Sequence, residues 1–268
     1  MAATKLPANR IIGEAYGFVF ANLGPLARAA AVPYAVLTVS LLRWLWAGYE
    51  HHMSPYALAM WILIQIAAVI PFQTQAYRFA LALTPDSRPR FGWPWSQRET
   101  RFALHSLGLV LVALAISFVT VAILAAYDGA DGTAPSSEAL GPTMARLTLL
   151  GAVSTIVALY VNARLSPVLA AASVGRPANW GMVWRATSGN GWRIAWAIVV
   201  AIVPWVAANL LIGILTRDVT FLPVLVVINL FANGLTLLGM AVLITAVALA
   251  YRHLVLGGAA PPTVSLIA

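Results

Sequence analysis

Six long runs of apolar residues follow one another along this chain, and each is long enough to cross a lipid bilayer as an α-helix. The runs cover residues 24–47, 56–80, 102–126, 143–168, 192–215 and 221–251. A helix needs about 20 predominantly apolar residues to span the hydrocarbon core. The pattern therefore predicts an all-α membrane protein with six transmembrane helices.

The polar residues divide the six runs into three pairs. Segments within a pair are short or acidic, whereas segments between pairs are long and basic. A stretch that mixes aromatic with charged residues precedes each pair, at 10–22, 92–101 and 177–185. Each stretch is typical of an amphipathic helix in the membrane interface. Pro94 suits a first helical turn in the second stretch, and Asn179 is a candidate N-cap in the third.

The second helix of each pair ends on a similar tripeptide with arginine in its last position. The three tripeptides are Ala76-Tyr77-Arg78, Asn162-Ala163-Arg164 and Ala250-Tyr251-Arg252. This recurrence predicts one membrane hairpin, with its interfacial helix, used three times within a single domain that covers 1–268. The three units extend over about residues 10–83, 91–174 and 178–256.

Composition and charge set the environment and the orientation. Hydrophobic residues make up 61% of the chain and charged residues only 9%, so the chain cannot cover a water-facing surface. The net charge is +8, and 15 of the 16 basic residues are arginine, which together with abundant alanine indicates a bacterial source. Thirteen basic residues fall on the side of both termini and three on the other. The positive-inside rule then predicts an inner-membrane protein with both termini cytoplasmic.

The same basic residues lie beside apolar spans, so anionic lipid headgroups, and not nucleic acid, are the expected partner. Arg78, Arg164 and Arg252 either converge on one basin that holds a phosphate or act as three separate anchors at the interface. Further candidate lipid-binding residues between the hairpins are Arg88, Arg176, Arg185 and Arg193.

Neutral amides are the main polar groups inside the spans. The candidates are Gln73, Asn162, Asn209, Asn229 and Asn233. They either line a polar cavity for a headgroup or small solute, or form hydrogen bonds between closely packed helices, which is a common role for amides in membranes.

The sequence offers little catalytic or metal chemistry. There is no cysteine, which excludes disulfides and thiolate sites. Acidic and histidine side chains collect only in two outer loops, at Glu50, His51, His52, Asp128 and Asp131. Adjacent histidines on a loop lack the spacing that presents two ligands on one helical face. We therefore expect solvated loops, no metal, no cofactor and no enzyme activity.

The third hairpin resembles a known family. The matching residues are the Arg-Leu-x₅-Ala run at 164–171, Gly175-Arg176-Pro177, Trp184-Arg185-Ala186-Thr187 and Gly189-Asn190-Gly191-Trp192-Arg193. They are similar to those of a largely uncharacterised bacterial inner-membrane family related to the membrane-anchor domain of some glycerophosphodiester phosphodiesterases. In the fused enzymes a catalytic domain follows the anchor. None follows the last span here, so we do not expect the phosphodiesterase reaction.

These observations favour a non-enzymatic membrane scaffold or accessory subunit that interacts with anionic lipid, with a second membrane protein or a second copy as a further partner. The alternative is a transporter or channel for a small anionic or amphipathic solute. A continuous cavity lined by Gln73, Asn209, Asn229 and Asn233 would favour that alternative.

Overall fold

The structure, a computed structural model, describes residues 5–50, 54–81, 89, 91–130, 140–177, 179–217, 219 and 221–257. All regular secondary structure in these residues is α-helical. Six helices are long and apolar enough to span a membrane, and they confirm the six expected spans. They are α2 (Leu23–Glu50), α3 (Pro55–Leu81), α4 (Gln97–Ala130), α5 (Leu140–Leu165), α8 (Gly191–Leu215) and α9 (Leu222–Leu254).

Helix α9 forms the centre of the molecule. Of its residues 61% are buried, against 11% in the membrane-length segments of α4 and of α8. It packs against α2, α3 and α8, and against two short helices, α1 (Ala8–Ala21) and α6 (Pro167–Ser173). Helices α2, α3 and α8 therefore surround α9 and expose apolar side chains outward, as expected for helices that face lipid.

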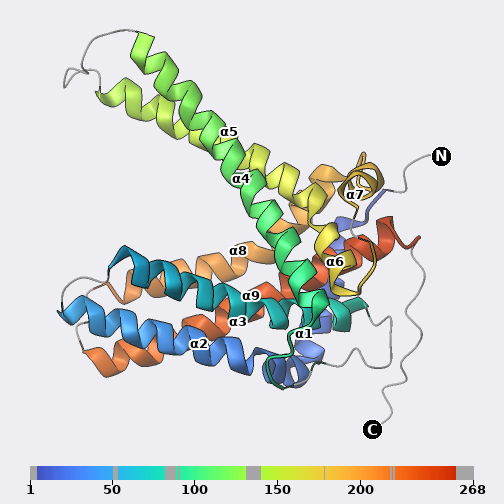
Figure 1. The fold of residues 1–268 in the computed structure, drawn as a ribbon, viewed down its shortest axis with the longest axis horizontal. Coiled ribbons are helices and arrows are strands. Elements are labelled where there is room, and N and C mark those ends of the chain that lie inside the picture. The colour runs from blue at the N-terminus through green and yellow to red at the C-terminus, as the bar shows by residue number, and fades with distance from the viewer. Residues whose placement is uncertain are drawn as a thin grey trace.

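Helices α2 and α3, α4 and α5, and α8 and α9 contact each other, but α3 also packs against α9 and α5 against α8. Figure 1 shows that α4 and α5 leave the rest of the bundle at an angle, so that their far ends stand apart from the other four long helices. That the three pairs derive from one repeated unit stays a prediction from the sequence.

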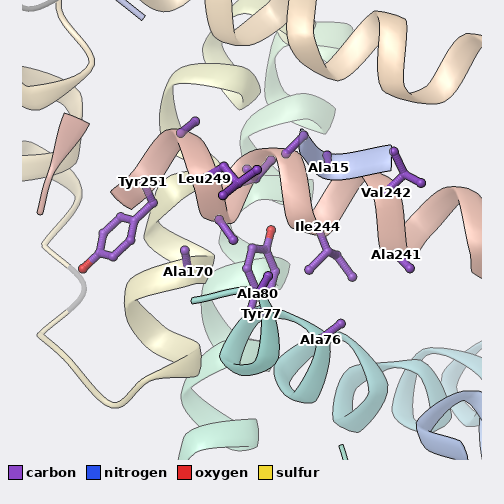
Figure 2. Close-up of a cluster of buried hydrophobic side chains, with 14 of the residues drawn as sticks. Ala15, Ala76, Tyr77, Ala80, Ala170, Ala241, Val242, Ile244, Leu249 and Tyr251 are labelled. Carbon is purple, nitrogen blue, oxygen red and sulfur yellow. The ribbon is translucent and has the colours of Figure 1, made fainter. Parts of the chain in front are cut away.

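Small side chains allow α9 to approach its neighbours closely. Ala76 and Ala80 of α3, Ala170 of α6 and Ala241 of α9 are buried in this contact (Figure 2). Tyr77 points from α3 toward α9 in the same view. Without a hydrophobic driving force between helices in lipid, van der Waals contact of this kind is a main source of association.

Three short helices, α1, α6 and α7 (Trp180–Ala186), gather at one end of the molecule, which we call the α1 end (Figure 1). In α1 the predicted apolar face is present, and Ile11, Ala15 and Val19 are buried. The helix packs against α8 and α9. The protein itself, and not the lipid of the membrane interface that the sequence predicted, therefore covers this face.

The second interfacial helix is not a separate element. Residues 93–96 are non-helical, and the helix begins at Gln97 and continues without a break into α4. A capping box sets this start: the Ser96 N–H donates to Glu99 Oε2 at 2.9 Å, and the Arg98 N–H donates to Ser96 Oγ at 3.2 Å. The expected helical turn at Pro94 was therefore wrong, because the cap lies two residues later.

The third stretch folds as predicted at its start. The Met182 N–H donates to Asn179 Oδ1 at 3.2 Å, which confirms Asn179 as the N-cap of α7.

The predicted fourth span contains a break that the apolar pattern hid. Helix α5 ends at Leu165, Ser166 forms a turn, and Pro167 starts α6. Proline suits a first helical position because its missing N–H would have no partner there. All residues of α6 except Leu169 are buried, and the helix packs against α3, α4 and α9.

Candidate functional site

Arg164, at the end of α5, is half-buried and bonded to other parts of the protein. Its Nε donates to Thr187 Oγ1 at 3.4 Å and its Nη2 donates to the Trp184 carbonyl. The guanidinium lies 3.6 Å from the centroid of the Trp184 ring. A planar guanidinium can stack and donate at once, which an ammonium cannot do. Arg164 therefore joins α5 to α7, in addition to any interaction with lipid.

Two more aromatic rings complete what we call the arginine–aromatic cluster, which consists of Tyr160, Arg164, Trp184 and Trp192. The Tyr160 and Trp192 ring centroids lie 4.8 Å apart. Gly191 starts α8 directly beneath the cluster, where a Cβ would lie 2.6 Å from the Tyr160 ring and 2.9 Å from Arg164 Cδ. Only glycine allows α8 to begin this close to α5.

Hydrogen bonds to the backbone of Leu6 hold the beginning of the described chain on the start of α8. Leu6 is fully buried, its N–H donates to Asn190 Oδ1 at 2.8 Å, and its carbonyl accepts from Arg193 Nη1 at 3.0 Å. Asn9 Oδ1 accepts from Trp196 Nε1 at 3.3 Å. We call residues 6–10 the N-terminal strap. No sequence signal links residue 6 to residue 190, so this contact was missed.

Between the strap and α8 lies a depression of about 490 Å³, bounded by Leu6–Arg10, Trp192, Arg193 and Trp196. Arg10 forms an exposed ion pair with Glu14 at 2.7 Å. Trp192 and Trp196 are more than half exposed and occupy one face of α8 at a spacing of four residues. Exposed tryptophan beside arginine is the composition of a membrane–water interface.

Tyr16 fixes α1 to the same helix. Its hydroxyl donates to the Ala201 carbonyl of α8 at 3.2 Å, and its ring stacks on Trp205 with centroids 6.2 Å apart. Burial raises the pKa of the Tyr16 phenol above its ordinary value, so the hydroxyl stays protonated and keeps donating.

The other candidate arginines are distributed around the α1 end. Arg78 and Arg252 are half-buried near the ends of α3 and α9, while Arg176 and Arg185 are exposed. Among the described residues, no hydrogen bond or ring contact joins Arg78 or Arg252 to Arg164. Arg88 lies outside the described residues.

Three of the five candidate amides bond within their own helices. The side chains of Asn162, Asn209 and Asn229 donate to the carbonyl four residues earlier, at 2.9, 2.9 and 2.8 Å. Gln73 Nε2 lies 3.3 Å from Met240 Sδ and thus contacts α9 from α3. The buried Asn233 Nδ2 has no hydrogen-bond partner in the described structure.

Neither of the two apolar grooves in the described structure brings these amides together. Asn209 lines a groove between α8 and α9, and none of the other four lines that groove. A second apolar groove, of about 460 Å³, lies between α2, α3 and α9 and contains none of the five.

Glu99 has a structural role that the sequence did not predict, since the pattern placed it only in a charged interfacial stretch. It is buried, and its Oε1 accepts from Thr74 Oγ1 of α3 at 3.2 Å. Its other oxygen accepts from Ser96. The Ser-x-x-Glu signature at 96–99 is visible in the sequence, but the partner on α3 is not.

The predicted outer polar set lies outside what the structure describes, since His51, His52 and Asp131 and the side chains of Glu50 and Asp128 are not placed. Among the described residues, no three histidine or acidic side chains cluster as metal ligands.

Comparison of the chain with protein-family models, curated proteins and solved structures found no match. A function for this protein has to be argued from its own geometry.

Proposed function

We propose that this protein is a non-enzymatic scaffold or accessory subunit of a bacterial inner membrane, and that its α1 end faces the cytoplasm and holds anionic phospholipid. The observation that supports this most is the distribution of charge. Arginine and tryptophan collect at the α1 end, whereas Glu99 is the one buried charged residue in the described part of the chain. A described interior with a single charged side chain suits a structural membrane domain better than an ion path.

Exposed guanidinium groups at this end are available to lipid phosphates. Arg176 and Arg185 are exposed, and Arg185 Nε donates one hydrogen bond of 3.3 Å to the Gly181 carbonyl of its own helix. A guanidinium carries five N–H donors in a planar fork that matches phosphate oxygens. Each basic residue near an anionic surface contributes about 1 kcal/mol to binding.

The relation to the phosphodiesterase membrane anchors is part of this proposal, because such anchors also hold a protein at the inner membrane. The exposed apolar faces of α4 and α5 leave room for a second membrane protein or a second copy. Orientation follows from the 13 basic residues on the side of the termini against three on the other.

A transporter or channel is the less favoured alternative. It needs the candidate amides along one pathway, but in the described residues Asn209 is separated from the others, and three amides donate within their own helices. An amide already bonded to its helix has less capacity to coordinate a solute.

The proposal is tested by comparing stability in two lipid mixtures. The protein is reconstituted into nanodiscs of phosphatidylcholine alone, or of phosphatidylcholine with phosphatidylglycerol, and thermal unfolding is followed by tryptophan fluorescence. We expect a higher midpoint with phosphatidylglycerol. The double variant Arg176→Gln and Arg185→Gln should lose most of this increase, and Arg43→Gln, at the opposite end, should keep it. Equal midpoints for the wild type in both lipids would contradict the proposal.

A further inference from the structure

A long groove between α8 and α9 opens on the opposite end of the molecule from the arginine–aromatic cluster. Its volume is about 660 Å³. On α8 it follows one face of the helix from Ile202 to Arg217, and on α9 it extends from Thr236 to Leu243. The helical part of this face, from Ile202 to the end of α8 at Leu215, is about 20 Å long at a rise of 1.5 Å per residue. The groove therefore exceeds the depth of one leaflet, which is half of the ~30 Å hydrocarbon core.

The inner part of the groove is shaped by an indole ring and a glycine. A Cβ on Gly239 would lie 2.5 Å from the Trp205 ring, so this ring sits directly on the α9 backbone. The ring forms a rigid apolar floor. Glycine at 239 is required for α8 and α9 to accommodate it.

Toward its Arg217 end the groove is open. Gly213 lines it, and a Cβ at this position would meet no atom within 4 Å. The neighbouring lining residues Leu210 and Ile214 expose 62% and 71% of their surface, so nothing in the described chain covers them.

The polar groups of the groove determine which ligand fits. Asn209 is the one amide in the lining, and it already donates to the Trp205 carbonyl of its own helix at 2.9 Å. Arg217 stands at the outer mouth, two residues beyond the end of the apolar span at Leu215, and is exposed. The groove thus combines an apolar channel in the hydrocarbon region with a single cation at headgroup level.

We propose that this groove binds one acyl chain of an anionic phospholipid from the leaflet opposite the α1 end, with the lipid phosphate on Arg217. The charge of Arg217 complements a phosphate, and the apolar length accepts a chain but offers almost no donors to a polar solute. A partner helix would have to contribute a carboxylate at Arg217. This site is independent of the lipid interaction proposed for the α1 end.

The test blocks the groove with a side chain that creates no clash. Gly213→Trp fills the open part of the groove, and the matched control Gly151→Trp places the same ring on an exposed position of α5 that also has open space. Both variants and the wild type are studied by native mass spectrometry from nanodiscs that contain equal amounts of phosphatidylglycerol and phosphatidylcholine of the same chain length. Gly213→Trp should reduce retained lipid about fivefold or more, and Gly151→Trp should not.

A second variant tests the headgroup contact. Arg217→Gln should retain the acyl chain but lose the preference for phosphatidylglycerol, while Arg43→Gln, another exposed arginine that does not line the groove, should keep that preference. Because the two sites carry different arginines, failure here and failure of the proposed function give different results.

A labelling experiment removes any dependence on folding of the tryptophan variant. The chain contains no cysteine, so Gly213→Cys carries a unique thiol that can be modified after purification. The unmodified variant should retain lipid like the wild type, and attachment of a bulky methanethiosulfonate should release it. Equal lipid retention before and after modification, or a change in oligomeric state in place of lipid loss, would overturn the proposal.

Discussion

Gly191 shows how one missing side chain sets the geometry of the α1 end. A methyl group there would lie within 3 Å of both Tyr160 and Arg164. We expect Gly191→Ala to destabilise the protein by about 1–3 kcal/mol, the usual cost of overpacking. The measurement is the shift of the thermal unfolding midpoint in detergent. Gly17→Ala is the control, because a methyl group there meets no atom within 4 Å and alanine favours the helix. A Gly191→Ala protein as stable as Gly17→Ala would show that α8 has room at this point.

Arg164 separates two explanations for the repeated arginines. If the repeated arginines only placed a positive charge at the interface, lysine would serve equally well. The stacking on Trp184 and the two hydrogen bonds need the planar guanidinium. We therefore expect Arg164→Lys to lower the free energy of unfolding by about 1–2 kcal/mol. The substitution should also change the fluorescence emission of the tryptophans in the arginine–aromatic cluster. Arg185→Lys, an exposed position in the same helix as Trp184, should change neither.

The N-terminal strap makes a prediction at the scale of a structural element. Leu6 is completely buried, and its backbone bonds to Asn190 and Arg193 hold the strap on α8. Leu6→Ala should weaken this docking by about 2–5 kcal/mol, as for other buried leucines. Hydrogen exchange of residues 6–12 should accelerate strongly, while exchange in α9 stays slow. Lys5→Ala, at an exposed neighbouring position, should leave the exchange pattern unchanged, and protection of the strap in Leu6→Ala would contradict the assigned role of Leu6.

How well the elements could be predicted depends on what fixes them. The thickness of the bilayer sets the length of an apolar helix, so the six spans were predictable from the hydropathy pattern alone. The N-cap at Asn179 was predictable because it depends on neighbours within one turn. The break at Ser166 was hidden, since the apolar run continues through it. Contacts such as that between Leu6 and Asn190 join residues 184 positions apart and leave no periodic signal.

The candidate site was predicted in composition but not in geometry. Arginine and tryptophan at the α1 end were expected from charge and interfacial patterns. That Arg164 would be enclosed between Tyr160 and Trp184 depends on the angle between α5 and α7. The sequence contains no measure of that angle. The amides illustrate the same limit, because whether Asn162 bonds across helices or within its own is decided by packing.

At the scale of the whole molecule, the helices form a compact group around α9 and a pair, α4 and α5, that diverges from it. Helix α9 is largely buried among α1, α2, α3, α6 and α8, whereas α4 and α5 lean away from this centre (Figure 1). Chemically the two ends differ, with the arginine–aromatic cluster and the strap at one and Arg217 at the other. This difference between the two ends corresponds to the difference between the two leaflets of a membrane.

The central claim is that six helices cross the membrane and leave the α1 end in the cytoplasm, and single-cysteine labelling in intact cells tests it most directly. Ser188→Cys lies in the turn between α7 and α8 at the α1 end, and Ser54→Cys lies before α3 at the other. Both positions are exposed, and the chain has no other cysteine. A membrane-impermeant thiol reagent should label Ser54→Cys in intact cells and Ser188→Cys only after permeabilisation. Labelling of Ser188→Cys from outside, or of both positions from the same side, would contradict the account.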